Sequence, residues 1–201
     1  MEEIRPNNHV NLRGTLREAP HFSHESRGER FYMFTLDLQR LSGAIDTVHI
    51  IAKQSLLASL TPQETEKICV IGELRSFNNK SGTGPRLVIT VYAREIRFEN
   101  GPDENLIDLT GVLCKQPNYR TTPMGREICD LMLAVNRRYG RSDYLPCIAW
   151  GSSAREAAQW DVGTQVHLTG RLQSRLYTKT LNGESTEKVA YEVSVLKLCA
   201  E

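Results

Sequence analysis

The sequence predicts an all-β protein made of two tandem five-stranded barrels, each with one short helix between its third and fourth strands. First, residues 107–150 repeat residues 10–53 at a constant offset of 97 positions, which aligns Gly14 with Gly111. Second, the strand-like segments alternate apolar and polar residues or are rich in β-branched residues. Third, a single helix-like segment interrupts the strands of each repeat.

The first repeat contains five strand-like segments, separated by clusters of Gly, Asn, Ser and Pro that favour turns. We expect its strands at 9–17, 30–40, 46–53, 67–77 and 86–97. A helix-like segment at 54–60 follows the third of these strands.

The second repeat has the same order of elements. We expect its strands at 106–114, 126–138, 143–150, 164–177 and 187–198. A helix-like segment at 152–160 again follows the third strand, and beyond it the offset is 98 positions, which aligns Gly72 with Gly170. Five strands with one helix after the third is the order of an OB-fold, a partly open barrel that binds oligonucleotides on one face.

The length agrees with two domains, because 201 residues is enough for two cores in domains of about 100 residues each. We expect domains at 1–99 and 105–201. The segment between them contains Gly101 and Pro102, as is typical of a linker.

The composition indicates a cytoplasmic protein. The chain has no apolar run of about 18 residues, and no N-terminal basic segment followed by an apolar stretch, which disfavours membrane insertion and secretion. The five cysteines are odd in number, form no CxxC pair and lie mostly among apolar neighbours. We therefore expect reduced thiols that act as small buried hydrophobes.

No catalytic, metal or cofactor site is predicted. Asp130, Asp143 and Asp161 are scattered, and the chain has no HExxH, GxGxxG or Walker pattern and no Cys/His cluster with metal-ligand spacing. The Gly-rich stretch at 80–85 lies between two strands and reads as a hairpin turn. A nuclease on an OB barrel is the enzymatic alternative, and these absences disfavour it.

The net charge is only +1, but basic residues gather in the second repeat. Between Lys115 and Arg141 there are six basic residues and only two acidic ones, and the stretch 164–179 holds three basic residues and no acid. Such stripes could neutralise phosphates. The alternative is that they are ordinary solvated surface charges.

Five segments of the second repeat resemble the bacterial single-stranded DNA-binding protein family, in the same order and at similar spacing. The segments are LTGVL at 109–113, PNYRTTPMG at 117–125, LAVNRR at 133–138, DYLPCIAWG at 143–151 and GRLQSRLY at 170–177. The resemblance is strong over 105–198 and weak over 8–97. It implies sequence-independent binding of single-stranded DNA in replication, recombination or repair, near the bacterial nucleoid.

In that family, bases stack on aromatic rings of the second, third and fourth strands, and flat rings accept any base. The positions that match are Tyr139, Tyr144, Trp150 and Tyr177. Tyr144 and Trp150 lie six residues apart on one strand, and therefore on one face. The cations that could track phosphates beside these rings are Arg120, Arg137, Arg138, Arg141, Arg171, Arg175 and Lys179.

Each aromatic residue also has a structural alternative, because Tyr and Trp often fill barrel cores or cover hairpin turns. A packing role is favoured for Tyr119, whose counterpart is Phe22, and a core or capping role for Trp160.

The first repeat lacks the stacking residues. The four positions that align with them hold Ser42, Thr47, Lys53 and Asn79. We expect this domain to supply mainly assembly surface, with weak phosphate contacts through Lys53, Arg75, Lys80 and Arg86.

The resemblance implies four barrels per functional unit, and therefore a homodimer of this two-barrel chain. The family's acidic C-terminal recruiting tail is absent from the sequence given, which favours a specialised role, such as one on a mobile element. Replication proteins remain possible partners. The alternative function is a primosome-type adaptor, similar to primosomal replication protein N, that acts through protein contacts. RNA binding also stays open, because stacking alone does not sense the 2′-hydroxyl.

Overall fold

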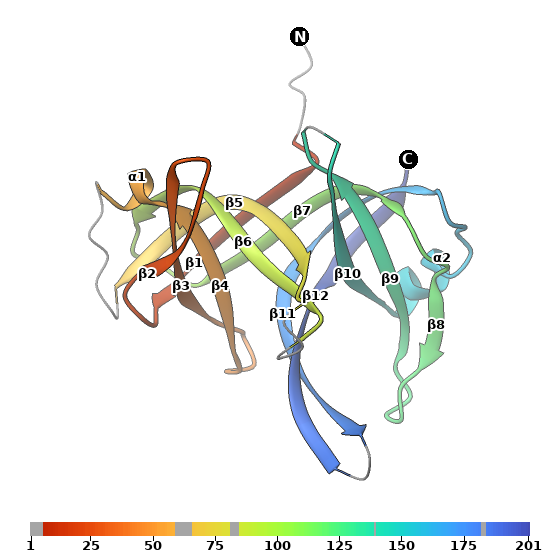
Figure 1. The fold of residues 1–201 in the computed structure, drawn as a ribbon. Helices are drawn as coiled ribbons and strands as arrows, with labels where there is room; N and C mark the ends of the chain where they lie inside the picture. Colours follow the sequence, from red (N-terminus) through yellow and green to blue (C-terminus); the bar gives the residue numbers. More distant parts are fainter. Residues whose placement is uncertain (1–5, 59–65, 81–84, 139, 182–183) are drawn as a thin grey trace. The chain divides into compact units, whose positions relative to one another are not determined.

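A computed structural model describes residues 6–58, 66–80, 85–138, 140–181 and 184–201. The contacts among residues divide the chain into two compact units, each drawn in Figure 1. The first unit comprises Met1–Arg75 and Thr90–Ile107, and the second comprises Ser76–Ile89 and Asp108–Glu201. Residues 76–89, which the sequence analysis placed in the first domain, thus group with the second unit.

The first unit is built around a closed barrel of five strands, and a sixth strand, β2 (His21–Ser26), pairs with β3 (Glu29–Gln39) outside the ring. The other elements are β1 (Asn8–Leu16), β4 (Ile45–Lys53), α1 (Gln54–Leu57), β5 (Lys67–Asn78) and β6 (Leu87–Phe98). The end of β5 from Ser76 and the start of β6 up to Ile89 group with the second unit. The strands pair in the order β2-β3-β4-β6-β5-β1, and an additional antiparallel pairing of β1 with β3, which sets Leu16 opposite Leu36, closes the barrel. The strands β4 and β6 pair in parallel, with Ile50 opposite Val91.

The second unit repeats this arrangement. Its elements are β7 (Glu104–Leu113), β8 (Asn118–Thr121), β9 (Glu127–Asn136), β10 (Ser142–Trp150), α2 (Gly151–Ala157), β11 (Gln165–Leu181) and β12 (Glu184–Ala200). The order is β7-β11-β12-β10-β9-β8, and pairing of β7 with β9 closes the barrel. The strands β10 and β12 pair in parallel, as β4 and β6 do.

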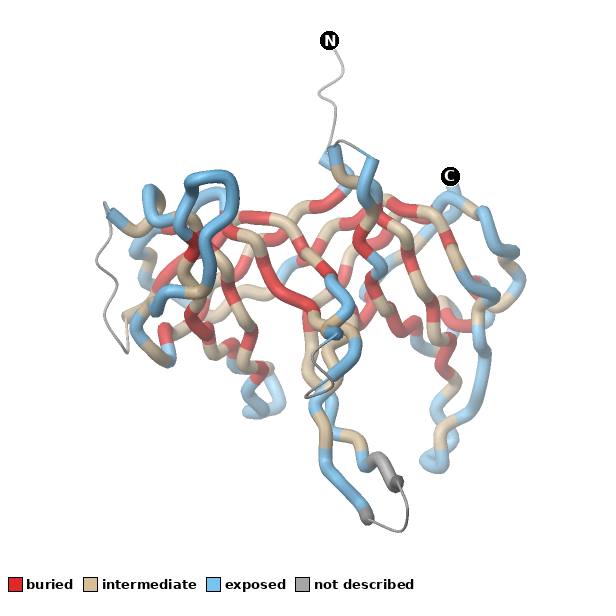
Figure 2. Tube along the Cα trace, viewed as in Figure 1, coloured by how far each residue is buried: buried red, intermediate tan, exposed pale blue. Residues whose placement is uncertain are grey.

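The core of each barrel follows from the period-two pattern of its strands. In β1 every second residue is buried, including Leu12 and Leu16, and in β4 the buried positions include Val48 and Ile50. Figure 2 shows buried residues alternating with partly exposed ones along the strands. The residues between the buried ones therefore form the outer face, which is accessible to a ligand.

Two of the repeated glycines permit close backbone packing. A Cβ on Gly14 would collide with the carbonyl oxygen of Asp37, and a Cβ on Gly111 would lie 2.8 Å from the carbonyl oxygen of Ala134. The glycine match between the repeats thus reflects one steric requirement that occurs twice.

The ten predicted strands are confirmed, with boundaries that differ by a few residues. Two short strands, β2 and β8, were not predicted. Both are exposed along almost their whole length, so no apolar alternation marks them. The last hairpin is also longer than predicted, because β11 and β12 each contain 17 residues. Figure 2 shows exposed residues along the outer part of both strands of this hairpin.

The helices are shorter than predicted, ending at Leu57 and Ala157. Residues 59 and 60 of the first predicted helix lie outside the described residues. No helix in the described parts of the chain is long and apolar enough to cross a membrane.

All five cysteines are free thiols. Cys69, Cys129 and Cys147 are buried, as predicted, and burial raises the pKa of the Cys147 thiol well above its ordinary value. The prediction of burial is wrong for Cys199, which is exposed near the end of β12.

Candidate nucleic-acid interface

Strand β10 presents two aromatic side chains on the outer face of the second barrel. Tyr144 is 51% exposed and Trp150 is 37% exposed, whereas Asp143, Leu145 and Ala149 on the intervening positions are buried. The alternation of a strand places both rings on one face. Neither ring fills the core, so the packing alternative does not hold for these two residues.

The indole of Trp150 is held by strand β12. Its Nε1–H donates a hydrogen bond of 3.1 Å to Oγ of Ser194. A buried tryptophan N–H normally finds such a partner, and the bond fixes one edge of the ring while part of the ring stays exposed. Ser194 was missed in the sequence analysis, because an isolated serine in a strand carries no aromatic or charge signal.

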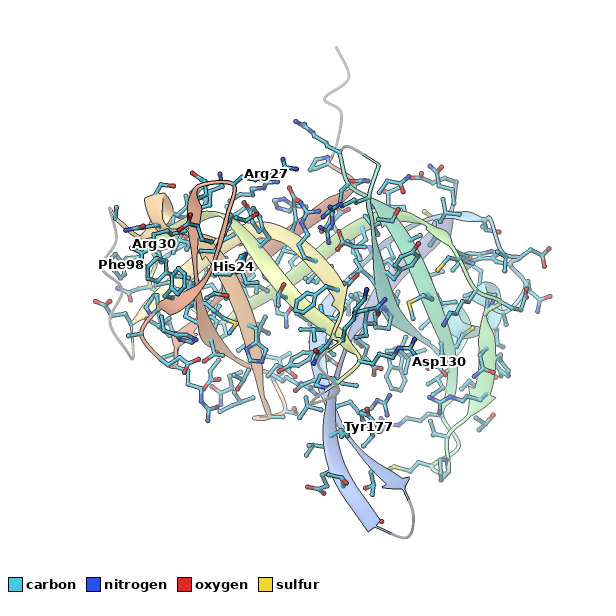
Figure 3. All side chains as sticks on the ribbon, viewed as in Figure 1. His24, Arg27, Arg30, Phe98, Asp130 and Tyr177 are labelled. Atoms are coloured by element: carbon cyan, nitrogen blue, oxygen red, sulfur yellow. The ribbon has the colours of Figure 1, made fainter. Side chains whose placement is uncertain are left out.

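Tyr177 lies on the long β11–β12 hairpin, where Figure 3 labels it. Its partner on β12 is Lys188. The guanidinium carbon of Arg175 lies 5.9 Å from the centre of the Tyr177 ring, within the range of a cation–π contact. Arg175 also faces Glu192 at 3.4 Å from Nε to Oε1. The predicted pairing of a ring and a cation on this strand is therefore present, together with an acidic neighbour that the charge count did not include.

Arg137 has a buried carboxylate as its partner. Its Nε donates to Oδ2 of Asp143 at 2.6 Å, its Nη2 donates to the other oxygen, and the Asp143 side chain is 0% exposed. Asp143 also accepts a hydrogen bond of 2.6 Å from the backbone N–H of Ser76, and Arg137 donates to the Ser76 carbonyl oxygen at 3.2 Å. Arg137 thus neutralises a charge inside the protein, which gives it a structural role that the sequence analysis did not foresee.

The same pair occurs in the first barrel. Arg40 donates to both carboxylate oxygens of Asp46, at 2.6 and 2.5 Å, and the Asp46 side chain is 1% exposed. These hydrogen bonds raise the pKa of the Arg40 guanidinium further above its ordinary value. The pair is part of the repeated fold, independent of the aromatic residues that distinguish the two barrels.

The sequence profile of the single-strand binding protein family matches residues 104–198. Single-stranded DNA-binding protein 2 of Listeria innocua is 33% identical over 103 residues, which cover 46% of this chain and 64% of that protein. Single-stranded DNA-binding protein 1 of Staphylococcus aureus is 35% identical over 80 residues, which cover 36% of this chain and 48% of that protein. The chain spans about half to two thirds of the length of these relatives.

The fold of both repeats also has a solved counterpart. The crystal structure of the wild-type single-stranded DNA binding protein from Thermus aquaticus has a TM-score of 0.80 and 22% sequence identity. The similarity covers 98% of this chain and 94% of that one. The predicted tandem OB-fold is thereby confirmed.

The remaining predicted cations lie on the strands and turns of the second barrel. Arg120 forms two hydrogen bonds to Asp130, at 2.7 and 3.2 Å, which raise the pKa of the guanidinium. Figure 3 marks Asp130 on β9. Arg138 and Arg141 are exposed, near the turn between β9 and β10.

The remaining predicted contacts are two cations on β11, Arg171 and Lys179, and the ring of Tyr139. Arg171 on β11 is half-buried, and its Nε has no hydrogen-bond partner within the described residues. Lys179 lies on β11 opposite Thr186, and its side chain is outside the described part of the chain. Tyr139 lies outside the described residues altogether.

The two residues with predicted packing roles also differ in exposure. Tyr119 is 40% exposed, and its hydroxyl donates to Glu127, which raises the pKa of the phenol. Trp160 is half-buried just beyond α2. No group of three or more metal-ligating side chains occurs within the ranges that the structure describes.

Proposed function

We propose that this protein binds single-stranded DNA without sequence preference, in replication, recombination or repair. The observation that carries the proposal is the pair of exposed rings, Tyr144 and Trp150, on one face of β10. Aromatic rings stack on any base, and each stacked base contributes about 1–3 kcal/mol. A surface of this kind binds single strands, whose bases are free to stack, in preference to duplex.

The strand spacing supports a path for the DNA along β10. Six residues separate Tyr144 from Trp150, which corresponds to about 20 Å along an extended strand. Several nucleotides span that distance. The hydrogen bond from Trp150 to Ser194 orders one ring before DNA arrives, so less conformational entropy is lost on binding.

The phosphate contacts that we propose come from the cations around the same barrel. They are Arg120, Arg138, Arg141, Arg171, Arg175 and Lys179, with Tyr139 as a further stacking residue. Arg175 and Arg120 already contact Glu192 and Asp130, so phosphate would compete with these carboxylates. Because bound phosphates release counterions, log K should fall with log salt by about 0.7 for each phosphate neutralised.

The two units would have different roles. We propose that the second unit is the main DNA-binding unit, that the first mainly supplies assembly surface, and that two chains associate to present four barrels. The protein would act as a binding protein with no catalytic step, on DNA of the bacterial nucleoid. Sedimentation of a single species with the mass of one chain at micromolar concentration would refute the dimer.

Tryptophan fluorescence tests the proposal directly, because Trp150 and Trp160 are the two tryptophans of the chain. Titration with oligo-dT should quench the emission, and the quenching should be lost in Trp150→Phe and kept in Trp160→Phe. Oligo-U in a parallel titration compares RNA with DNA.

The absence of binding to either oligonucleotide would refute the proposed function. It would favour the primosome-type adaptor, for which binding of a replication protein without DNA is the positive test.

A further inference from the structure

We propose that the first unit carries a second single-strand contact, an aromatic and cationic cluster made of His24, Phe31, Tyr92, Lys53, Arg75 and Arg94. This inference rests on the proposed function and extends it to the unit that lacks the family's stacking residues. Of the four positions that align with those residues, the cluster uses only Lys53, and its rings come from other positions.

Strand register brings the cluster together on one face. Phe31 of β3 lies opposite His24 of β2 on one side and opposite Lys53 of β4 on the other. Tyr92 of β6 pairs with Ile51, two residues before Lys53 on the same face of β4. The alternate residues of β4, from Asp46 to Ala52, are buried, so this is the outer face of the barrel.

The rings form a short stack that is open at one end. The His24 imidazole lies parallel to the Phe31 ring, with 4.8 Å between the centroids and 8° between the planes. Phe31 is 9% exposed, whereas His24 is exposed, so a buried ring supports a planar heterocycle that faces solvent. Tyr92 continues the cluster, at 6.1 Å from Phe31. Figure 3 marks His24.

The outer surface of His24 has the shape and the polarisability that a base requires. We infer that a base stacks on this surface and that the neighbouring base contacts the Tyr92 ring. A protein partner is less well matched, because the exposed part of the cluster is planar and cationic rather than apolar.

Cations surround the Tyr92 ring. The guanidinium carbons of Arg94 and Arg75 lie 4.8 and 5.7 Å from its centre, and both residues pair with one carboxylate, Glu73. Lys53 pairs with Glu29. Arg94 is half-exposed beside a ring that can take a base, so a phosphate could compete with Glu73 for its guanidinium. Phosphate is the counterion that fits this arrangement.

The test compares oligo-dT of two lengths on the full chain. We expect a short oligonucleotide to occupy the stronger Tyr144–Trp150 surface, and a long one to contact the first unit as well. His24→Ala with Tyr92→Ala should leave binding of the short strand unchanged and weaken binding of the long strand by about fivefold or more, since one stacked base contributes at least about 1 kcal/mol. His24→Phe with Tyr92→Phe should restore the affinity.

The matched control is Leu41→Ala, which alters another side chain of the first unit that is fully exposed. Equal affinity of the double alanine variant and the unaltered protein for the long strand would overturn the inference, while the fluorescence response of Trp150 still reports on the proposed function. On the unaltered protein, irradiation of a long oligonucleotide that contains bromodeoxyuridine should crosslink peptides with His24 or Tyr92. Crosslinks confined to the second unit would also overturn the inference.

Discussion

Removing Arg137 should destabilise the second barrel much more than removing its exposed neighbour Arg138. Arg137→Ala leaves the carboxylate of Asp143, which is 0% exposed, without its guanidinium partner. Breaking a buried ion pair from one side costs about 3–5 kcal/mol. Because Arg137 itself is 26% exposed, water can partly replace it, and we expect the lower end, about 3 kcal/mol. Arg138→Ala should change stability by less than about 0.5 kcal/mol.

Urea unfolding followed by tryptophan fluorescence is the suitable assay, because both tryptophans belong to the second unit and report on its unfolding. Asp143→Asn adds a check on the cause. Combined with Arg137→Ala, it should cost less than the sum of the single changes, by about 0.5–3 kcal/mol for residues in direct contact. If Arg137→Ala proves as mild as Arg138→Ala, or if the two changes add, the buried pair does not stabilise the barrel.

Three further predictions concern packing, pH and thiols. Gly111→Ala should lower the free energy of unfolding by about 1–3 kcal/mol in the same urea assay, because its methyl group would lie 2.8 Å from the carbonyl oxygen of Ala134; an unchanged midpoint would contradict this reasoning. Burial lowers the pKa of His49 below 6.5, so the folded state favours the neutral ring. Stability from this residue should be complete above about pH 6.5 and fall as the pH drops below that value. His49→Gln should make the melting temperature depend less on pH, whereas an unchanged pH dependence of the melting temperature would argue against this role. Cys199 should react at once with an aromatic disulfide reagent, whereas Cys147 should react only on unfolding; early modification of Cys147, found by mass spectrometry, would be inconsistent with its burial.

The sequence was most informative where one physical requirement occurs twice. Gly14 and Gly111 match because a strand crosses close above each, and the apolar alternation of the long strands reflects the burial of one face. The strands β2 and β8 lack a buried face, so they were not predicted. The same reason explains why the β11–β12 hairpin is longer than predicted, because its outer residues are exposed and show no apolar alternation.

The sequence predicted which face of the strand the aromatic rings occupy, but it did not predict which arginines pair with acidic residues of the protein. Tyr144 and Trp150 could be assigned to one face because strand spacing fixes it. A sequence cannot distinguish a solvated arginine from one that neutralises a buried acid, so Arg137 was assigned to phosphate although Asp143 lies beside it in the hairpin. Lys53 and Arg75 of the first unit were predicted as phosphate contacts, but the rings beside them were missed, because the comparison of the repeats examined only the positions equivalent to the stacking residues.

The alternation of β4 and β10 separates what each barrel needs for folding from what it presents to a ligand. The inward residues, the close-packed glycines and the Arg–Asp pair are the same in kind in both copies, whereas the outward residues differ. The outer face of one copy can therefore differ in chemistry from that of the other without altering the interior that folds it. Substitutions on the outer face of one barrel should change ligand binding in small steps while the fold of both barrels is kept.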